Sequence, residues 1–358
     1  MIGLALLAPL SSFAEENGAN KKKPNIIYIL ADDLGISELG CYGQQLIETP
    51  NIDRLSQEGM TFSNHYSGTA VSAPSRCVLF TGLHTGHAYI RGNDEMASRG
   101  NVWNHKAVLA DSTLEGQRPV PAETVMIPAV MKQAGYTTAC IGKWGLGYPG
   151  SASTPNKMGF DFFYGYNCQR EAHTYYPPFL YRNEHREYLN NPLVVPHTKL
   201  DKGADPYEEK SYAKYTLNEY APDLMYKEIL NFIDLTKDNP FVLFWTTPLP
   251  HVPLQAPEKE RIASAIESRP VVTGKNDDGI VIDSQFFKFI NKSPDLFIPV
   301  ADHGFCEIAK VECPTTDGIS FLPELLGKKQ NKHDFLYWEF PDSGGNICLF
   351  SGIRIQII

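Results

Sequence analysis

The sequence predicts an α/β fold in which a mostly parallel central sheet carries helices on both faces. Three runs predict strands: Asn25–Leu30 and Phe241–Thr247 are mainly apolar without the alternation of a half-buried strand, and Tyr136–Ile141 leads directly into Gly142-Lys143. Unbroken runs of this kind are typical of strands that are buried on both faces, as in parallel sheets. Helix-like segments separate the three runs, and strands that alternate with helices are typical of α/β layers.

The other elements follow from hydrophobic periodicity and from stop signals along the chain. Glycines close two of the predicted helices, because glycine readily adopts the left-handed conformation found after a last helical turn. A segment rich in Tyr, Asn and Pro, Met158–Tyr220, predicts a long excursion that walls a pocket. The predicted helices are Asn51–Glu58, Pro74–Gly82, Glu123–Gln133 and Pro222–Leu235, and Met60–Tyr66 is predicted as a further strand.

Polar residues stand directly after several of the predicted strands. Asp32 follows the first strand, Lys143 follows the second buried run, and His251 follows the third. Open α/β sheets place their binding sites at the carboxyl ends of their strands. We therefore expect these side chains to meet at one edge of the sheet.

Composition sets limits on the class of protein. The chain has 358 residues, 42% apolar and 20% charged, which is enough for one large domain or two medium ones. These values exclude a disordered chain, a collagen and a coiled coil. The net charge of −9 argues against a general nucleic-acid binder. Seven cysteines without a CxxC pair argue against a zinc ribbon or a dense disulfide framework.

The two ends of the chain suggest how it is organised. Residues 1–22 predict a signal peptide and linker, because the apolar run Ile2–Pro9 precedes small residues suited to cleavage. We therefore expect a periplasmic or secreted protein, and no run is long enough to span a bilayer. The main domain is predicted over 23–345, with an irregular part at 260–305 that is consistent with an internal deletion. Residues 346–358 form an atypical tail.

Asp32 and Asp33 stand side by side after the first strand. Two adjacent carboxylates repel each other, and a cation is needed to keep both ionised in a shared site. Hard oxygen ligands suit Ca²⁺ or Mg²⁺. The alternative interpretation of this pair is a helix N-cap in a solvated turn.

A longer motif follows at residues 72–82, SAPSRCVLFTG, which fits the sulfatase signature S/C-x-P-x-R followed by T-G. The residues that fit it are Ser72, Pro74, Arg76, Thr81 and Gly82. Together with PNIIYILADD, TPNIDRLSQEG, GKW and PHVP in the family's order, they make the chain resemble the formylglycine-dependent sulfatases of the alkaline-phosphatase-like superfamily. The resemblance covers Lys23–Leu254 and resumes over Glu307–Gly345. From the resemblance we expect the family's smaller C-terminal sheet domain to be largely missing after Gly345.

The resemblance implies a chemistry for four residues. Ser72 would be converted to formylglycine, and a Ser rather than a Cys implies an anaerobic sulfatase-maturating enzyme as partner. From the sequence alone, Ser72 enters a helix whose free N–H groups favour an anion. Arg76, on the same helical face, would hold the aldehyde hydrate or a metal-bound oxygen. The resemblance also implies that Lys143 binds the sulfate and that His251 acts as general acid.

The chain departs from the family in two places. Many sulfatases carry a histidine two residues after the sulfate-binding lysine, and this chain has Gly145 there. The family's second pair of metal ligands is matched only by Asp302-His303, with Asp277-Asp278 as a weaker candidate. The ligands that the resemblance implies for Ca²⁺ or Mg²⁺ are thus Asp32, Asp33, Ser72, Asp302 and His303.

The substrate is predicted less directly. The resemblance and the aromatic excursion suggest a sulfated carbohydrate, with stacking on Tyr164, Tyr166, Tyr175 and Tyr176 and contacts from His87 and His173. Each histidine is equally well explained as a polar loop side chain that bonds to backbone. Two alternatives to sulfate ester hydrolysis stay open. One is a phosphate or phosphonate ester hydrolase of the same superfamily, and the other is a catalytically inactive, truncated remnant.

Overall fold

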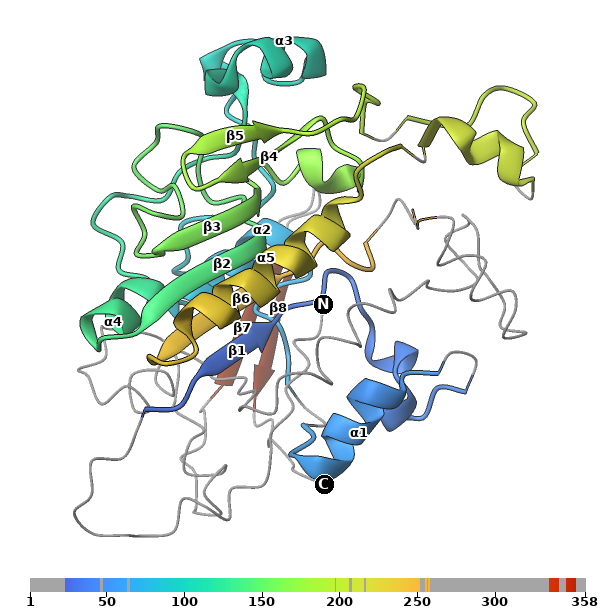
Figure 1. Cartoon of the computed structure of the whole chain (residues 1–358). Coiled ribbons are helices and arrows are strands. Elements are labelled where there is room, and N and C mark those ends of the chain that lie inside the picture. Colours follow the sequence, from blue (N-terminus) through green and yellow to red (C-terminus); the bar gives the residue numbers. More distant parts are fainter. Residues whose placement is uncertain are drawn as a thin grey trace, which may run out of the picture.

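A six-stranded sheet in the order β1-β6-β2-β3-β4-β5 forms the centre of the protein (Figure 1). The computed structural model describes residues 23–45, 48–62, 65–196, 198–205, 208–215, 217–251, 255, 257, 335–340 and 346–351. β1 (Ile26–Ile29), β6 (Phe241–Thr246), β2 (Thr137–Lys143) and β3 (Phe162–Tyr166) run parallel. β4 (Phe179–Arg182) and β5 (His185–Tyr188) add two antiparallel strands at one edge. The predicted, mostly parallel sheet is confirmed.

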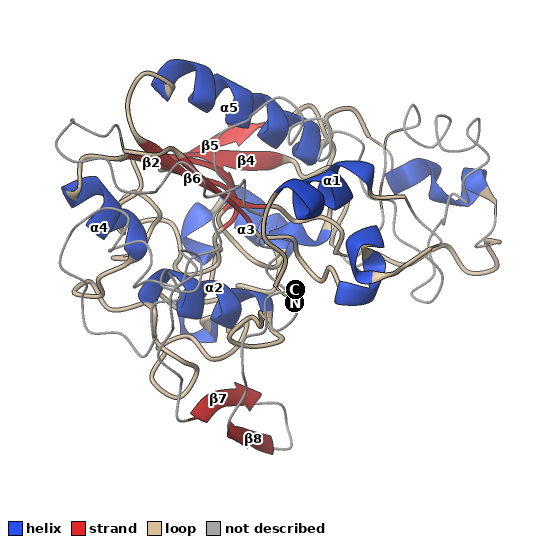
Figure 2. Cartoon of the chain, turned by 90° about the horizontal axis from the view of Figure 1, so that it is seen from below, coloured by secondary structure: helices blue, strands red, loops and turns tan. Residues whose placement is uncertain are grey.

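Helices cover both faces of this sheet, as predicted (Figure 2). α1 (Pro50–Glu58) and α5 (Ala221–Thr236) contribute to the apolar cluster on one face. α2 (Ser72–Thr81) and α4 (Ile127–Gln133) contribute to the cluster on the other face. Successive strand residues point to opposite faces, which explains why nearly every residue of β6 and β2 is buried, whichever face it points to.

Aromatic side chains fix α2 on the sheet. The ring of Phe80 lies 5.1 Å from that of Phe244 on β6 and 5.7 Å from that of Trp144, which follows β2. Phe160 meets Phe80 edge to face at 5.6 Å. Edge-to-face aromatic pairs add about 0.5–1.5 kcal/mol beyond the burial of their area. The helix that carries the signature residues is therefore held rigidly over the strand ends.

Two predicted elements differ from the structure. The described residues of Met60–Tyr66 contain no strand. The helix predicted over Glu123–Gln133 begins only at Ile127, because Thr124 closes a turn onto Pro121 and Met126 is extended. Pro128 lies in the first turn of α4, where a residue without an N–H group is tolerated. Its presence explains the late start of the helix.

The prediction of a long excursion over Met158–Tyr220 is partly wrong. β3, β4 and β5 all lie within it and extend the sheet. The short run FFYGY contains a glycine, and glycine weakens a strand signal. Shorter elements complete the described fold: α3 (His105–Ala110) and the 3₁₀ turns Ile36–Glu38, Gly40–Tyr42, Ala97–Arg99, Ser112–Leu114, Glu171–His173 and Glu209–Tyr215.

β7 (Phe335–Phe340) and β8 (Asn346–Ser351) form a separate antiparallel pair. Their pairing joins residues on both sides of the predicted domain boundary at residue 345. The irregular part predicted at 260–305 lies outside the described residues. Among the helices that are described, none is long and apolar enough to cross a membrane.

Candidate active site

A buried carboxylate, that of Asp32, lies at the centre of the carboxyl edge of the sheet. Its Oδ1 accepts a hydrogen bond of 2.7 Å from the Ser72 hydroxyl, and its Oδ2 accepts one from the Lys143 ammonium. The backbone N–H of Asp32 donates to the carbonyl of Leu249 at 2.9 Å, which anchors it to the segment after β6. Three residues predicted at separate strand and helix ends are thus in direct contact.

The charges in this cluster depend on one another. Burial alone would raise the pKa of Asp32, but the Lys143 ammonium, the charge of His251 and the Ser72 hydroxyl outweigh it and hold this pKa below its usual value. Burial lowers the pKa of Lys143, and the Asp32 carboxylate opposes this effect. Both side chains are almost fully buried, at 1% and 3% exposure. Each therefore needs the other to carry its charge.

Ser72 is the first residue of α2, and the helix end explains the rest of its motif. Thr81 Oγ1 donates to the Cys77 carbonyl at 2.6 Å, and Gly82, at φ 71°, closes the helix with its N–H on the Val78 carbonyl. A left-handed residue after the last turn favours glycine. The Thr-Gly half of the motif therefore ends the helix and contributes no chemistry of its own.

The start of α2 offers fewer free donors than the sequence predicted. The N–H of Ala73 already donates to Asn93 Oδ1 at 3.1 Å, and Pro74 has no N–H group. The sequence predicted that free N–H groups at the start of this helix would attract an anion. That prediction is wrong for Ala73 and Pro74, since neither has a free N–H to offer. Side-chain cations take the larger share of any attraction for an anion here.

Lys143 is placed by a glycine kink at the end of β2. Gly142 has φ 127°, and a Cβ on it would lie 1.9 Å from the Thr246 carbonyl oxygen. Gly165, its partner on β3, would likewise bring a Cβ within 2.0 Å of the Gly142 carbonyl. Thr246 Oγ1 donates to the Lys143 carbonyl at 2.8 Å. The close approach of β6, β2 and β3 thus turns the lysine toward Asp32.

Arg76 is buried on α2, one turn after Ser72. Its Nε donates to the Trp144 carbonyl at 2.6 Å, and its Nη2 donates to Gln169 Oε1. Burial lowers its pKa to about 10, with Asp32 opposing the shift. The guanidinium is therefore still charged at neutral pH, and it acts electrostatically on Lys143 as well.

His251 joins the same edge from the segment after β6. Its Nε2 lies 3.2 Å from Asp33 Oδ2, and its ring meets that of His173 edge to face at 4.8 Å. The Tyr175 hydroxyl donates to the His251 carbonyl and holds this turn in place. The predicted residues His251, His173 and Asp33 are thus brought together, beside the Asp32 cluster.

His87 lies after α2 and stacks on His84, with ring centroids 4.3 Å apart. His173 Nδ1 lies 3.0 Å from the Arg170 carbonyl oxygen. A carbonyl oxygen can only accept a hydrogen bond, so this nitrogen carries the proton. The interpretation of His173 as a loop side chain that bonds to backbone therefore holds for its Nδ1 atom. Its ring also contacts the ring of His251.

The four tyrosines predicted to stack on sugars are buried. Their exposure is between 1% and 2%, and their rings lie in the apolar clusters of the protein. Hydroxyl contacts tie three of them to the protein, for example Tyr166 to the Thr174 carbonyl at 2.6 Å. This prediction is wrong for Tyr164, Tyr166, Tyr175 and Tyr176, because the segment that carries them belongs to the sheet and its packing.

The donor set for a divalent cation is incomplete in the described part of the chain. Asp32 and Asp33 present hard carboxylate oxygens, and Asp33 is half exposed in a left-handed conformation at φ 61°. No group of three or more His, Cys, Asp or Glu able to hold a metal occurs among the described residues. The oxygen chemistry fits Ca²⁺ or Mg²⁺, but Ca²⁺ takes six or more ligands. Asp302, His303 and the weaker Asp277-Asp278 pair lie outside the described residues.

Three site residues were missed by the sequence reasoning: Gln169, Gln117 and Asn93. Gln169 bonds Arg76, Gln117 bonds the backbone of Gln169, and Asn93 bonds the start of α2. Gln169 follows β3, so the rule that placed Asp32 at a strand end would have found it had FFYGY been identified as a strand. No signal in the sequence points to Asn93.

Comparisons with known proteins identify the family of the chain. The Sulfatase family model matches residues 24–269. The chain is 38% identical to an N-acetylgalactosamine-6-O-sulfatase of Bacteroides thetaiotaomicron over 45% of this chain and 30% of that one. It is 30% identical to an N-acetylgalactosamine-6-sulfatase of Canis lupus familiaris over 91% of this chain and 58% of that one. The chain thus spans about a third to somewhat over half of the lengths of these relatives.

Solved structures show the same fold. The crystal structure of Ps i-CgsB superimposes with a TM-score of 0.64 at 21% identity, over 92% of this chain and 83% of that one. A structure from work on glycosaminoglycan metabolism by Bacteroides thetaiotaomicron gives a TM-score of 0.61 at 20% identity, over 93% and 87%. With a family match over more than half of its length and this fold around the signature residues, the chain belongs to the sulfatase family.

Proposed function

We propose that the protein hydrolyses a sulfate ester on a carbohydrate, with a nucleophile made from Ser72. The observation that carries the proposal is the contact of Ser72 and Lys143 with one buried carboxylate, Asp32, in a chain with the sulfatase signature. A hydroxyl, a cation and an anion held together in a buried site suit the attack on an anionic ester and the stabilisation of its charge.

The side chains of the site have different proposed roles, which follow from their charge and position. Lys143 and Arg76 supply two buried cations that would bind the sulfate oxygens and stabilise charge as it shifts toward the leaving group, and Arg76, one turn after Ser72, would also hold the aldehyde hydrate. His251, whose Nε2 lies 3.2 Å from Asp33 Oδ2, would donate a proton to the leaving ester oxygen. Asp32 orients both the Ser72 hydroxyl and the Lys143 ammonium.

Two groups beyond the chain's own side chains complete the proposal. Formylglycine at position 72 would supply an aldehyde hydrate, whose two hydroxyls allow both attack and release of the sulfate. Asp32 and Asp33 would hold Ca²⁺ or Mg²⁺, which supplies positive charge to the reacting group. Asp302 and His303 are proposed as further ligands, since two carboxylates leave the coordination of Ca²⁺ unfilled.

A sulfated carbohydrate is the proposed substrate class. The N-acetylgalactosamine sulfatases to which the chain is similar bear names that specify a sulfated amino sugar. The buried tyrosines do not contribute to this proposal. It rests on the similarity to those relatives and on the cationic pair Lys143 and Arg76.

The test begins with Ser72. The protein is coexpressed with an anaerobic sulfatase-maturating enzyme, and the mass of the peptide that carries Ser72 is measured. We expect a loss of two hydrogens at Ser72 and release of sulfate from a panel of sulfated sugars and aryl sulfates. Ser72→Ala, which cannot be converted, is the matched control and should release none.

Two results would contradict the proposal. An unmodified Ser72 would remove the nucleophile, and converted protein that releases no sulfate would favour the inactive remnant. The missing third metal ligand among the described residues is the observation that favours that alternative. Faster cleavage of an aryl phosphate than of the matched aryl sulfate would instead support the phosphate ester hydrolase.

We also infer that the protein is exported, from the apolar run Ile2–Pro9 and the small residues after it. Sequencing the N-terminus of protein recovered from the periplasm or the medium tests this inference. A mature chain that begins after Ala14 is expected, and an uncleaved chain confined to the cytoplasm would contradict it.

A further inference from the structure

The space around Gly145 is filled by the side chains that hold Arg76. Gly145 has φ 74°, and a Cβ on it would lie 2.7 Å from Arg76 Nη2 and 2.8 Å from Gln117 Oε1. Its N–H donates to the Asn167 carbonyl at 3.0 Å, which joins the segment after β2 to the segment after β3. Only a glycine leaves room for a guanidinium and a carboxamide at this point.

A chain of hydrogen bonds leads from Gln117 to Arg76. Gln117 Oε1 accepts from the backbone N–H of Gln169 at 3.1 Å, and Gln169 Oε1 accepts from Arg76 Nη2. Gln117, Gln169 and Arg76 are exposed by only 2%, 3% and 2%. Because the amide oxygens are buried among fixed partners, this arrangement has little freedom to shift.

The two bonds of Arg76 determine the direction of its remaining nitrogen. A guanidinium is planar, so fixing Nε on the Trp144 carbonyl and Nη2 on Gln169 fixes the whole group. Nη1 is then the guanidinium nitrogen that has no hydrogen-bond partner among the described residues. It is left for a ligand, in a direction that the protein dictates.

We propose that Gln169, supported by Gln117 and by the space that Gly145 leaves, is the positioning residue that aims Arg76 at the substrate. The proposal deepens the proposed function and rests on it, because Arg76 is one of the two cations assigned to the sulfate. Gln169 acts through Arg76 and does not contact the reacting atoms.

A double-mutant cycle tests this role in the matured protein. Gln169→Leu removes the accepting oxygen, and we expect kcat to fall by about 10–100-fold, which corresponds to the loss of a hydrogen bond to a charged group. The Arg76→Lys variant has no planar guanidinium for Gln169 to orient. In that background, Gln169→Leu should therefore alter kcat by no more than about twofold. Gln169→Glu keeps an acceptor and should retain more activity than Gln169→Leu.

The matched control is Gln133→Leu, at an exposed position on α4, which should leave kcat and KM unchanged. An equal loss from Gln169→Leu in both backgrounds would show a merely structural role and overturn the proposal. So would a Gln169→Glu variant that is no better than Gln169→Leu while both stay folded by circular dichroism.

A second readout needs no sulfatase activity. In protein labelled with ¹⁵N-arginine, the Nη2–H resonance of Arg76, the group that donates to Gln169, is identified by its absence in Arg76→Lys. We expect slow solvent exchange of this proton in the native protein and faster exchange in Gln169→Leu. An unchanged rate would overturn the proposal. If no sulfate ester is cleaved, the proposed function fails, and this measurement still decides whether Gln169 holds Arg76.

Discussion

Asp32 connects most of the chemistry in the site, because its two carboxylate oxygens are used by different partners. Ser72 bonds one oxygen and Lys143 bonds the other. A buried ion pair of this kind has a small net effect on stability, since desolvation offsets the attraction. Removing one partner alone is costly, because the other charge is left buried without compensation. The pair is therefore better explained by the site than by stability.

Lys143→Met tests the dependence of Asp32 on its partner. With divalent cations chelated, we expect the free energy of unfolding to fall by about 3–5 kcal/mol, because the buried Asp32 carboxylate loses its ion pair and keeps only the Ser72 hydroxyl as a side-chain hydrogen-bond donor. Sulfate release should be lost as well. The double variant Lys143→Met with Asp32→Asn should recover part of the stability and none of the activity. Urea unfolding followed by circular dichroism measures the changes in stability, and a sulfate-release assay measures those in activity.

The surface ion pair Lys132–Asp161 provides the matched control, since its lysine side chain is 54% exposed. Lys132→Met should cost at most about 1 kcal/mol, because exposed pairs are screened by solvent. A Lys143→Met variant that unfolds at the same urea concentration as Lys132→Met would contradict the assigned dependence.

Single residues differed in how well the sequence predicted them. Ser72 and Lys143 were predicted because each belongs to a short motif at the end of a helix or strand. Gln169 and Gln117 belong to no motif, and their role depends on a contact between segments more than fifty residues apart. The tyrosines failed as sugar contacts because the sequence shows residue type but not burial.

At the scale of the element, glycines allow backbones to approach closely where the site is built. Gly142 on β2 faces the carbonyl of Thr246 on β6, and Gly165 on β3 faces the carbonyl of Gly142. Both glycines have positive φ angles, which residues with a side chain rarely adopt. The direction in which β2 releases Lys143 therefore depends on residues without side chains.

Gly142→Ala is expected to destabilise the protein severely. The new Cβ would lie 1.9 Å from the Thr246 carbonyl oxygen, a backbone atom that cannot move without breaking the pairing of β2 with β6. We expect a loss above about 4 kcal/mol, which is at the extreme of single substitutions. The melting temperature from calorimetry, or the absence of soluble protein, measures this effect.

Gly150→Ala separates the steric clash from the effect of φ. Gly150 has φ 83°, and a Cβ on it would meet no atom within 4 Å. Only the cost of a left-handed alanine applies there, about 1–2 kcal/mol. Equal destabilisation by the two variants would show that the close approach to Thr246 is not the cause.

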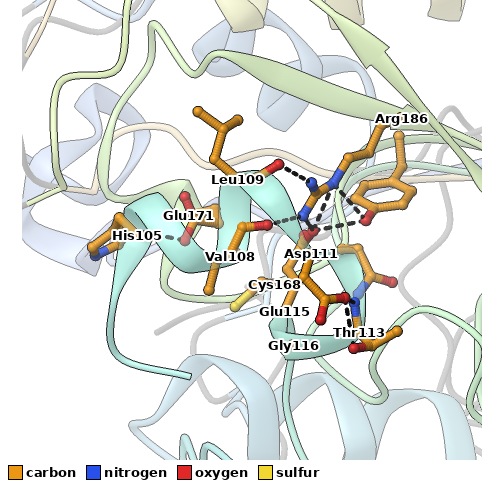
Figure 3. A network of polar contacts seen from close by, with 12 residues as sticks. His105, Val108, Leu109, Asp111, Thr113, Glu115, Gly116, Cys168, Glu171 and Arg186 are labelled. Atoms are coloured by element: carbon orange, nitrogen blue, oxygen red, sulfur yellow. Dashed lines mark hydrogen bonds and ion pairs between the residues drawn. The ribbon is translucent and has the colours of Figure 1, made fainter. Parts of the chain in front are cut away.

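At the scale of the whole molecule, a buried polar network ties the segment around α3 to the β4-β5 edge (Figure 3). Arg186 on β5 donates to Glu115 Oε2 at 2.8 Å and to the carbonyls of Val108 and Leu109 at the end of α3. The Tyr181 hydroxyl on β4 donates to the same carboxylate at 2.7 Å. Among the described residues, Glu115 Oε1 is buried without a hydrogen-bond partner. The network is therefore held by one carboxylate, of which only Oε2 accepts hydrogen bonds from the described residues.

This network predicts a pH dependence of global stability. Burial raises the pKa of Glu115 to about 7, although the Arg186 guanidinium opposes the shift. The unfolded chain loses this proton near pH 4.5, so between about pH 4.5 and 7 the folded state binds more protons than the unfolded state. Glu115 therefore lowers the free energy of unfolding as the pH rises through this window.

Glu115→Gln removes that titration. Relative to wild type, we expect the variant to gain roughly 3 kcal/mol between pH 4.5 and 7, the product of the shift and the energy per pKa unit. Urea unfolding at several pH values measures the difference. Glu123→Gln, at an exposed position before α4, is the matched control. A constant difference between Glu115→Gln and wild type across the window would contradict the prediction.

The sequence by itself determined the local units of this protein. The apolar runs of β1 and β6 specify buried strands, because both faces of the sheet are covered by helices. The Ser72–Gly82 motif specifies a helix with a polar start and a glycine stop, and the ordered motifs identify the family. These features depend on neighbours within a few residues.

Only the tertiary structure decided how the units meet. It placed β3, β4 and β5 in the sheet where an excursion was expected, and buried the tyrosines with them. It brought Gln169 from the end of β3 onto Arg76 and filled the space at Gly145. Such contacts arise from the lateral order and close approach of the strands. That order is set by packing between segments distant in the chain, which no local pattern encodes.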